Sequence, residues 1–222
     1  MYNTLGAINT IFIIVSLYGV FSQLRTIWRR KRQANTDKNS TALLSLNQFS
    51  VSYLAYFSFF VYGYSITPFN HYIVWPRLVA SVLVAFILIA IWQDRRSKTS
   101  LLALMMVGIA SLIGGAGLLF GGELEDTGKQ VSTTLIVIVT LLIAQGYYHQ
   151  IKLIINSKQT GAIDLKMSQF ILMMDISTIA FALSMGLATG WPLLMLATVS
   201  AITKLIIMYL FNWVKYQKPL TQ

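Results

Sequence analysis

Residues 150–175 read QIKLIINSKQTGAIDLKMSQFILMMD, and this stretch decides the interpretation of the whole chain. One apolar helix ends at its start, a polar turn follows, and a second apolar helix carries Asp175 in its middle. An acid inside a membrane costs on the order of 3 kcal/mol on insertion scales, so such residues usually serve a function. Asp175 is therefore the first candidate for a functional residue.

The first half of the chain contains the same stretch in a second copy. The matching segments are Gln23-Leu24-Arg25 with Gln150-Ile151-Lys152, Thr41 to Leu46 with Thr160 to Leu165, and Trp75-Pro76 with Trp191-Pro192. A match of this kind predicts an internal repeat of three helices in each copy, with both copies in the same orientation.

Composition places the chain in the membrane. Hydrophobic residues make up 56% of it and charged residues 11%, which is more apolar than a soluble domain of this length could bury. The formal net charge is +10, but the basic residues lie in short loops between apolar segments, so we expect no nucleic-acid partner. Cysteine is absent, which excludes disulfides and thiolate metal ligands.

Seven apolar segments are each about long enough to cross a hydrocarbon core of ~30 Å. They are Leu5–Trp28, Ser45–Tyr64, Tyr72–Trp92, Ser100–Phe120, Ser132–Ile155, Met167–Ala188 and Trp191–Val214. Basic residues follow the first, third, fifth and seventh segments, so the positive-inside rule places the N-terminus outside and the C-terminus in the cytoplasm.

The fourth segment has no charge and is rich in small residues that let neighbouring helices approach closely: Gly108, Ser111, Gly114, Gly115 and Gly117. Three crossings leave the chain on the opposite side of the membrane from its start, and a fourth crossing brings it back. The second triplet can then enter the membrane in the same orientation as the first. The sequence therefore predicts an all-α membrane protein with a first repeat at 1–97, a linker at 98–128 and a second repeat at 129–222.

The turn from Lys158 to Leu165 resembles the Lys-Ser-Thr-Glu-Gly-Leu-Ser-Leu turn of the PQ-loop superfamily, which includes the SWEET sugar transporters and cystinosin. Gln23 and Gln150 match the glutamine of that motif, while Ser22 and His149 stand where the family has proline. By this resemblance, Ser22, Gln23, His149 and Gln150 are candidates for a gate or hinge.

Residues 173–178, Met-Met-Asp-Ile-Ser-Thr, are similar to the Leu-Leu-Asp-Phe-Thr segment of cystinosin-like members. The aspartate of that segment is implicated in proton coupling. The resemblance covers most of the chain and implies two parallel three-helix bundles that alternate access to a central site.

Lys204, in the last segment, is the second intramembrane charge. Counting from Lys166 and Lys215 places Asp175 and Lys204 each ~14–17 Å from the cytoplasmic face, so an ion pair between them is expected. Two interpretations stay open: a structural pair, or a site for protons or substrate. A zwitterionic substrate would replace both partners, its ammonium at Asp175 and its carboxylate at Lys204.

Other polar and aromatic residues are weaker candidates. Tyr53, Tyr56 and Gln145 are candidates for lining a cavity, although aromatic residues at this spacing also serve packing. Arg77, near the outer end of the third segment, is expected to extend its side chain to the membrane surface.

We expect a transporter of a small polar solute, proton-coupled and with an amino-acid-like substrate. The nearest alternative is a proton-independent sugar facilitator of the SWEET type, and a receptor or scaffold with seven helices is a third. No phosphate-loop or metal-ligand spacing is present, so we expect no enzyme, metal or cofactor. A homo-oligomer is compatible with the sequence.

Overall fold

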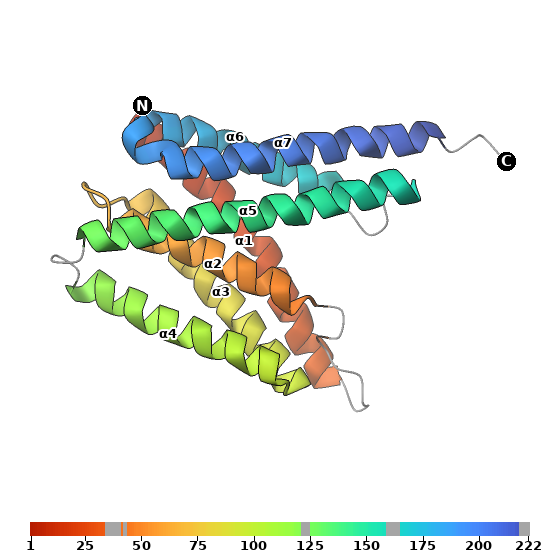
Figure 1. Cartoon of the computed structure of the whole chain (residues 1–222), viewed down its shortest axis with the longest axis horizontal. Coiled ribbons are helices and arrows are strands. Elements are labelled where there is room, and N and C mark those ends of the chain that lie inside the picture. The colour runs from red at the N-terminus through yellow and green to blue at the C-terminus, as the bar shows by residue number, and fades with distance from the viewer. Residues whose placement is uncertain (34–40, 42–43, 121–124, 159–164, 218–222) are drawn as a thin grey trace. The chain divides into compact units, whose positions relative to one another are not determined.

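The computed structural model describes residues 1–33, 41, 44–120, 125–158 and 165–217, and all regular structure in these ranges is helical (Figure 1). The helices are α1 (Tyr2–Gln33), α2 (Leu46–Tyr64), α3 (His71–Arg95), α4 (Lys98–Phe120), α5 (Glu125–Ser157), α6 (Leu165–Ser184) and α7 (Leu187–Gln217). The all-helical fold expected from the sequence is confirmed.

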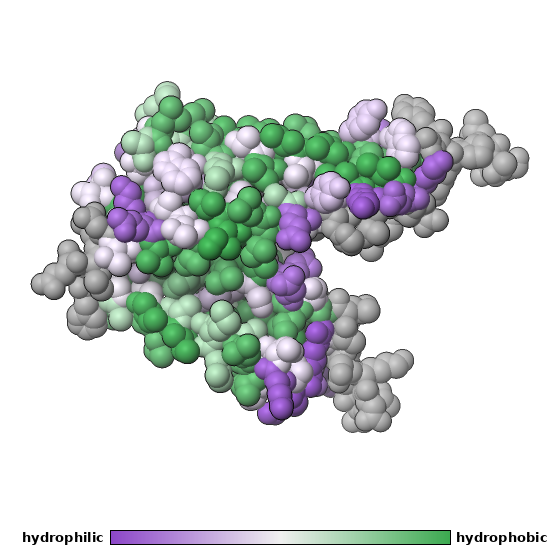
Figure 2. Space-filling model, viewed as in Figure 1, coloured by the Kyte–Doolittle hydropathy of each residue, from purple (hydrophilic) through white to green (hydrophobic). Residues whose placement is uncertain are grey.

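Several of these helices suit a lipid environment. Within the described residues, α1, α3, α4, α5 and α7 are long and apolar enough to cross a membrane. Large apolar side chains of α4 are exposed, among them Leu112, Ile113 and Leu119, and Figure 2 shows that the visible surface of α4 is mostly apolar. The chain is a multi-pass membrane protein. Membrane crossings by α2 and α6 stay predictions.

The chain forms two compact units. The first, the α2–α4 unit, comprises residues 13–136, and the second, the α6–α7 unit, comprises residues 1–12 and 137–222. Helices α1 and α5 each contribute to both units. The division into two repeats and a linker at residues 97 and 128 stays a prediction.

In the α2–α4 unit, α2 packs against α3 and α4 through a row of aromatic side chains. The rings of Tyr53 and Phe57 are stacked with centroids 5.6 Å apart, and the Tyr53 hydroxyl lies 2.7 Å from Ser111 Oγ on α4. A Cβ atom at Gly114 would lie 2.6 Å from the Phe57 ring, and one at Gly117 would lie 2.6 Å from the Tyr64 hydroxyl. The close approach predicted for these two glycines is confirmed, whereas Gly108 and Gly115 face open space.

The turn before α2 is fixed to the end of α3. The backbone N–H of Thr41 donates to Asp94 Oδ2 at 2.9 Å, and Arg95 Nη2 donates to the carbonyl oxygens of Thr41, at 2.9 Å, and Leu44. The α3 helix then ends because Arg96 adopts a left-handed conformation with φ of 49°. The corresponding turn of the second copy, Thr160 to Leu165, lies almost wholly outside the described residues.

In the α6–α7 unit, α6 and α7 form an antiparallel hairpin whose helices run side by side (Figure 1). Gly186, with φ of 81°, lies in the turn between them, where a residue with a side chain would be strained. A Cβ atom at Gly190 would collide with the carbonyl oxygen of Ala182, so the two backbones touch at this point.

The same pair of positions touches in the hairpin of α2 and α3. Aligning Leu165 with Leu46 matches position 182 to Gly63, and aligning Trp191 with Trp75 matches position 190 to Val74. A Cβ atom at Gly63 would lie 2.9 Å from Val74 Cγ2. The same Cβ atom would lie 2.9 Å from Ile73 Cγ2, so the two hairpins agree in register to within one residue. This agreement supports the repeat that the sequence predicts.

Candidate functional site

Both units contain buried polar side chains; those of the α6–α7 unit include the two charges that the sequence singles out, and we call the buried polar side chains of this unit the polar cluster. The cluster consists of Asn9, Thr140, Ser168, Asp175, Ser177, Thr178, Ser200 and Lys204. Polar groups in an apolar interior are costly unless they have partners, so such a group of residues needs a structural or functional reason.

Asp175 lies on the buried face of α6. Its side chain is 3% exposed, and Ser168, Thr178 and Ala182 are buried at spacings of seven, three and seven residues from it. These spacings bring side chains to one side of an α-helix. The carboxylate is therefore held inside the unit rather than on its lipid-facing surface.

Asn9, from the first turns of α1, joins this part of α6. Its Oδ1 accepts hydrogen bonds from Thr178 Oγ1 at 2.8 Å and from Ser177 Oγ at 3.2 Å. Both hydroxyls also lie within 2.9 Å of the Met174 carbonyl oxygen, so each shares one hydrogen between two acceptors. Asn9 is 1% exposed and thus links α1 to α6 one turn from Asp175.

Lys204 lies on the buried face of α7 and is 7% exposed. Its Nζ is 4.3 Å from the centre of the Tyr147 ring on α5, a cation–π contact. This is the contact that the described part of the chain provides for the ammonium, and an ion pair with Asp175 is not among its contacts there.

The register of the hairpin explains this arrangement. Because position 190 lies opposite position 182 and the helices are antiparallel, Asp175 lies level with Ala197, and Lys204 lies level with Ser168. Seven residues separate Ala197 from Lys204, which is roughly 10 Å along the helix. The sequence estimate treated Lys166 and Lys215 as lying at one level, but in this register Lys166 lies level with Ile206, nine residues before Lys215.

One solved structure covers this chain almost completely. A eukaryotic SWEET transporter matches it with a TM-score of 0.72 over 97% of this chain and 97% of that chain, at 14% sequence identity. The chain has the fold of a SWEET transporter. No family model matches the sequence, and no curated protein matches it. The SWEET-like membrane fold expected from the sequence is confirmed.

Within this SWEET-like fold, Tyr53 and Tyr56 lie in the α2–α4 unit. Tyr53 is buried, and its hydroxyl also lies 3.2 Å from the Val107 carbonyl oxygen. Tyr56 is half-buried, with the Arg77 guanidinium 5.6 Å from its ring centre. A role for either tyrosine in lining a cavity stays a prediction.

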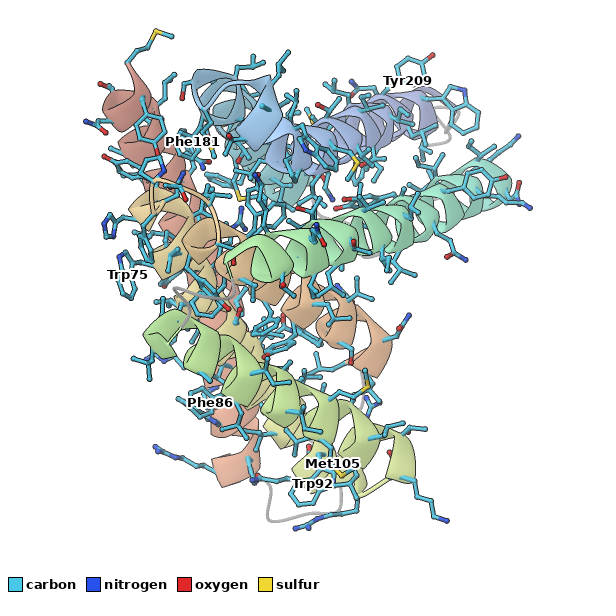
Figure 3. The ribbon with its side chains drawn as sticks, turned by 60° about the vertical axis from the view of Figure 1, so that its left-hand side comes forward. Trp75, Phe86, Trp92, Met105, Phe181 and Tyr209 are labelled. Atoms are coloured by element: carbon cyan, nitrogen blue, oxygen red, sulfur yellow. The ribbon has the colours of Figure 1, made fainter. Side chains whose placement is uncertain are left out.

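Arg77 does not reach the surface as expected. Its side chain is 7% exposed, and its guanidinium lies 5.3 Å from the Phe59 ring on α2. The neighbouring Trp75 is exposed instead, and Figure 3 shows it at the edge of the structure. The aromatic faces of α2 therefore provide a favourable site for this cation within the unit.

The candidates for a gate or hinge lie in the second halves of α1 and α5, two or more turns before these helices end. Ser22 and Gln23 are exposed on α1, and Gln145 is exposed on α5. His149 and Gln150 belong to α5, but their side chains lie outside the described residues. The roles predicted for these residues stay predictions. The described residues include no group of three or more histidines and acids that could hold a metal ion.

Sequence reasoning found Asp175 and Lys204 but missed Asn9 and Tyr147. A charge in an apolar segment is conspicuous because it is costly there, whereas Asn9 near the start of α1 and Tyr147 within α5 are neutral. The available signal was the position of Asn9, a polar residue inside the first apolar segment. Its role could be recognised only from the fold, in which α1 packs against α6 and Asn9 bonds to it.

Proposed function

We propose that this protein is a membrane transporter that moves a small polar solute by alternating access. The observation that carries the proposal is the likeness to a SWEET transporter over nearly the full length of both chains. The multi-pass helical fold and the polar cluster inside the α6–α7 unit support it.

Asp175 is the residue to which we assign proton coupling. It is a buried acid in a helix of a membrane protein, next to hydroxyl and amide groups of Ser177, Thr178 and Asn9. Intramembrane acids in such surroundings commonly exchange protons as a transporter changes state. A solute that binds the carboxylate would compete with a proton or accompany it.

We infer that the solute is amino-acid-like, with one ammonium and one carboxylate. Asp175 offers a negative partner and Lys204 a positive one, and both lie within the same compact unit. A solute with both charges offers each side chain an opposite charge, whereas a sugar offers neither.

The test uses the purified protein in lipid vesicles that contain a pH-sensitive dye. Amino acids, simple amines and sugars are added one at a time, and the internal pH is recorded. We expect one amino-acid class to change the pH, and Asp175→Asn to abolish that change.

Asp94→Asn is the matched control, because Asp94 is an acid at the end of α3 that serves the turn before α2. It should leave the pH change intact. Exchange of a radiolabelled sugar without any pH change would replace our proposal with a sugar facilitator, and no movement of any solute would favour a receptor or scaffold.

A further inference from the structure

The end of α1 is a dense basic segment that contains an exposed tryptophan. Residues 25–32 read RTIWRRKR, in which five of eight positions are basic. Trp28 is 46% exposed, and Arg25, Lys31 and Arg32 are exposed as well. Basic segments of this density beside a membrane-crossing helix attract negatively charged headgroups. The segment is thus a candidate site for an anion at the membrane surface.

One exposed face of α1 runs from apolar residues into this basic segment. The face consists of exposed side chains at alternating spacings of three and four residues: Ile14, Tyr18, Phe21, Arg25, Trp28 and Arg32. Such spacings keep side chains on one side of an α-helix. The apolar part, from Ile14 to Phe21, is roughly 10 Å long, and tryptophan is favoured at the level of lipid headgroups. The face therefore changes from apolar to basic in the order in which a phospholipid changes from acyl chain to headgroup.

A depression of about 360 Å³ lies at this end of α1, lined among the described residues by Trp28, Lys31 and Arg32. Pockets for small ligands commonly measure about 300–1,000 Å³, so a headgroup can fit. Lys31 Nζ donates to Oε1 of Gln93, near the end of α3, at 2.6 Å. Because that amide is neutral, the bond holds the ammonium next to α3 without cancelling its charge. The ammonium has three N–H groups, so it can also donate to a ligand.

The adjoining ends of α1 and α3 carry an excess of positive charge, and Figure 2 shows hydrophilic residues gathered at this end of the α2–α4 unit. The α1 helix contains no acid, and α3 contains one, Asp94, whose Oδ2 accepts the Thr41 backbone N–H. Arg96, two residues further, is exposed, with its guanidinium 4.6 Å from the Trp92 ring centre. A ligand in the depression therefore meets a field that favours an anion.

The second copy of the repeat lacks these residues. When Gln150 is aligned with Gln23, Ile155 stands opposite Trp28, and Gln159 stands opposite Arg32. The lysines Lys152 and Lys158 stand opposite Arg25 and Lys31, so part of the charge is common to both copies. The tryptophan and the density of arginines belong to the first copy alone. The repeat itself therefore does not require them.

We propose that the end of α1 binds an anionic phospholipid of the leaflet that it faces. The headgroup phosphate occupies the depression at Lys31 and Arg32, Trp28 lies beside the glycerol, and the acyl chains follow the apolar face from Phe21 to Ile14. A zwitterionic phospholipid has the same phosphate but carries its own cation, so it gains less from the basic residues. This inference does not depend on the proposed transport function.

The first experiment measures lipid binding to the purified protein in detergent by native mass spectrometry. The dissociation constant of the first bound lipid is compared for phosphatidylglycerol and phosphatidylcholine with identical acyl chains. We expect phosphatidylglycerol to bind about tenfold more tightly or better, and equal constants would overturn the inference. Glycerol 3-phosphate, which lacks acyl chains, should bind about a hundredfold more weakly than phosphatidylglycerol. Equal binding of both would show a site for soluble phosphates and overturn the lipid as its occupant.

A pair of double variants tests the charges. Lys31→Gln with Arg32→Gln should weaken phosphatidylglycerol binding about 25-fold, since each basic residue near a membrane surface contributes about fivefold. Lys152→Gln with Lys158→Gln is the matched control, because it removes two exposed lysines of the second copy, and it should leave the constant within about twofold. Lys31→Arg with Arg32→Lys keeps both charges and should retain the binding. Equal weakening in the first two double variants would show a general charge effect and overturn the site.

Tryptophan fluorescence tests where the lipid lies. Acyl chains that carry bromine quench the tryptophans that they touch, and the chain has five of these residues. Trp28 and Trp75 are similarly exposed, at 46% and 48%. The quenching by brominated phosphatidylglycerol in excess of brominated phosphatidylcholine should disappear in Trp28→Phe and persist in Trp75→Phe. An excess that persists in Trp28→Phe would place the anionic lipid elsewhere and overturn the assignment.

Discussion

At the residue scale, neutral side chains as well as charged ones hold the helices together in the polar cluster. Asn9 has no charge, yet it receives two hydroxyl hydrogen bonds from α6. Through these bonds the first turns of α1 are held next to Asp175. A helix that also contributes residues to the other unit is thereby joined to the buried acid.

Asn9→Ala tests the strength of this link. We expect the free energy of unfolding to fall by about 1 kcal/mol, because both hydroxyls retain the Met174 carbonyl oxygen as an acceptor. Thermal unfolding in detergent measures the change, and Thr4→Ala, at an exposed position of the same helix, should have no effect. A loss above about 3 kcal/mol would mean that the carbonyl is no substitute for Asn9.

At the element scale, the two hairpins show how much the sequence could predict. The repeat could be recognised from the sequence because the Trp-Pro pairs and the polar turns recur. The contacts between the paired helices agree with it: position 63 touches position 74, and position 182 touches position 190. The level of Lys204 could not be predicted, because the register of a hairpin depends on where two backbones touch. One glycine opposite one carbonyl determines it here.

Gly190→Ala tests this contact. The new methyl group meets the Ala182 backbone, which cannot rotate away, so α6 and α7 must separate at a cost of roughly 1–3 kcal/mol. Gly146→Ala on α5 is the control, because nothing lies within 4 Å of its added Cβ. The control should be neutral or gain up to about 1 kcal/mol from better helix propensity. Equal melting temperatures for the two variants would contradict the close contact.

At the scale of the whole molecule, composition was enough to predict a helical membrane protein, and the likeness to a SWEET transporter confirms that fold. The number of crossings was less predictable. Within the part of the chain that the structure describes, five helices meet the length and apolarity expected of a membrane span, while α2 carries several polar and tyrosine side chains. Such side chains lower the apolarity of a helix that is itself buried by its neighbours.

Because the sequence contains no cysteine, single cysteines can decide the crossings of α2 and α6 without other changes. Asn47→Cys, in the first turn of α2, and Thr67→Cys, after its end, mark the two ends of α2; Asn156→Cys and Ala188→Cys lie before and after α6, and all four positions are exposed. If both helices cross, an impermeant maleimide added from the cytoplasmic side should label positions 47 and 156, and one added from outside should label 67 and 188. The readout is the label bound in vesicles of known orientation. Labelling of both ends of a helix from one side would show that this helix does not cross the membrane. The two repeats would then not have the parallel orientation predicted for them.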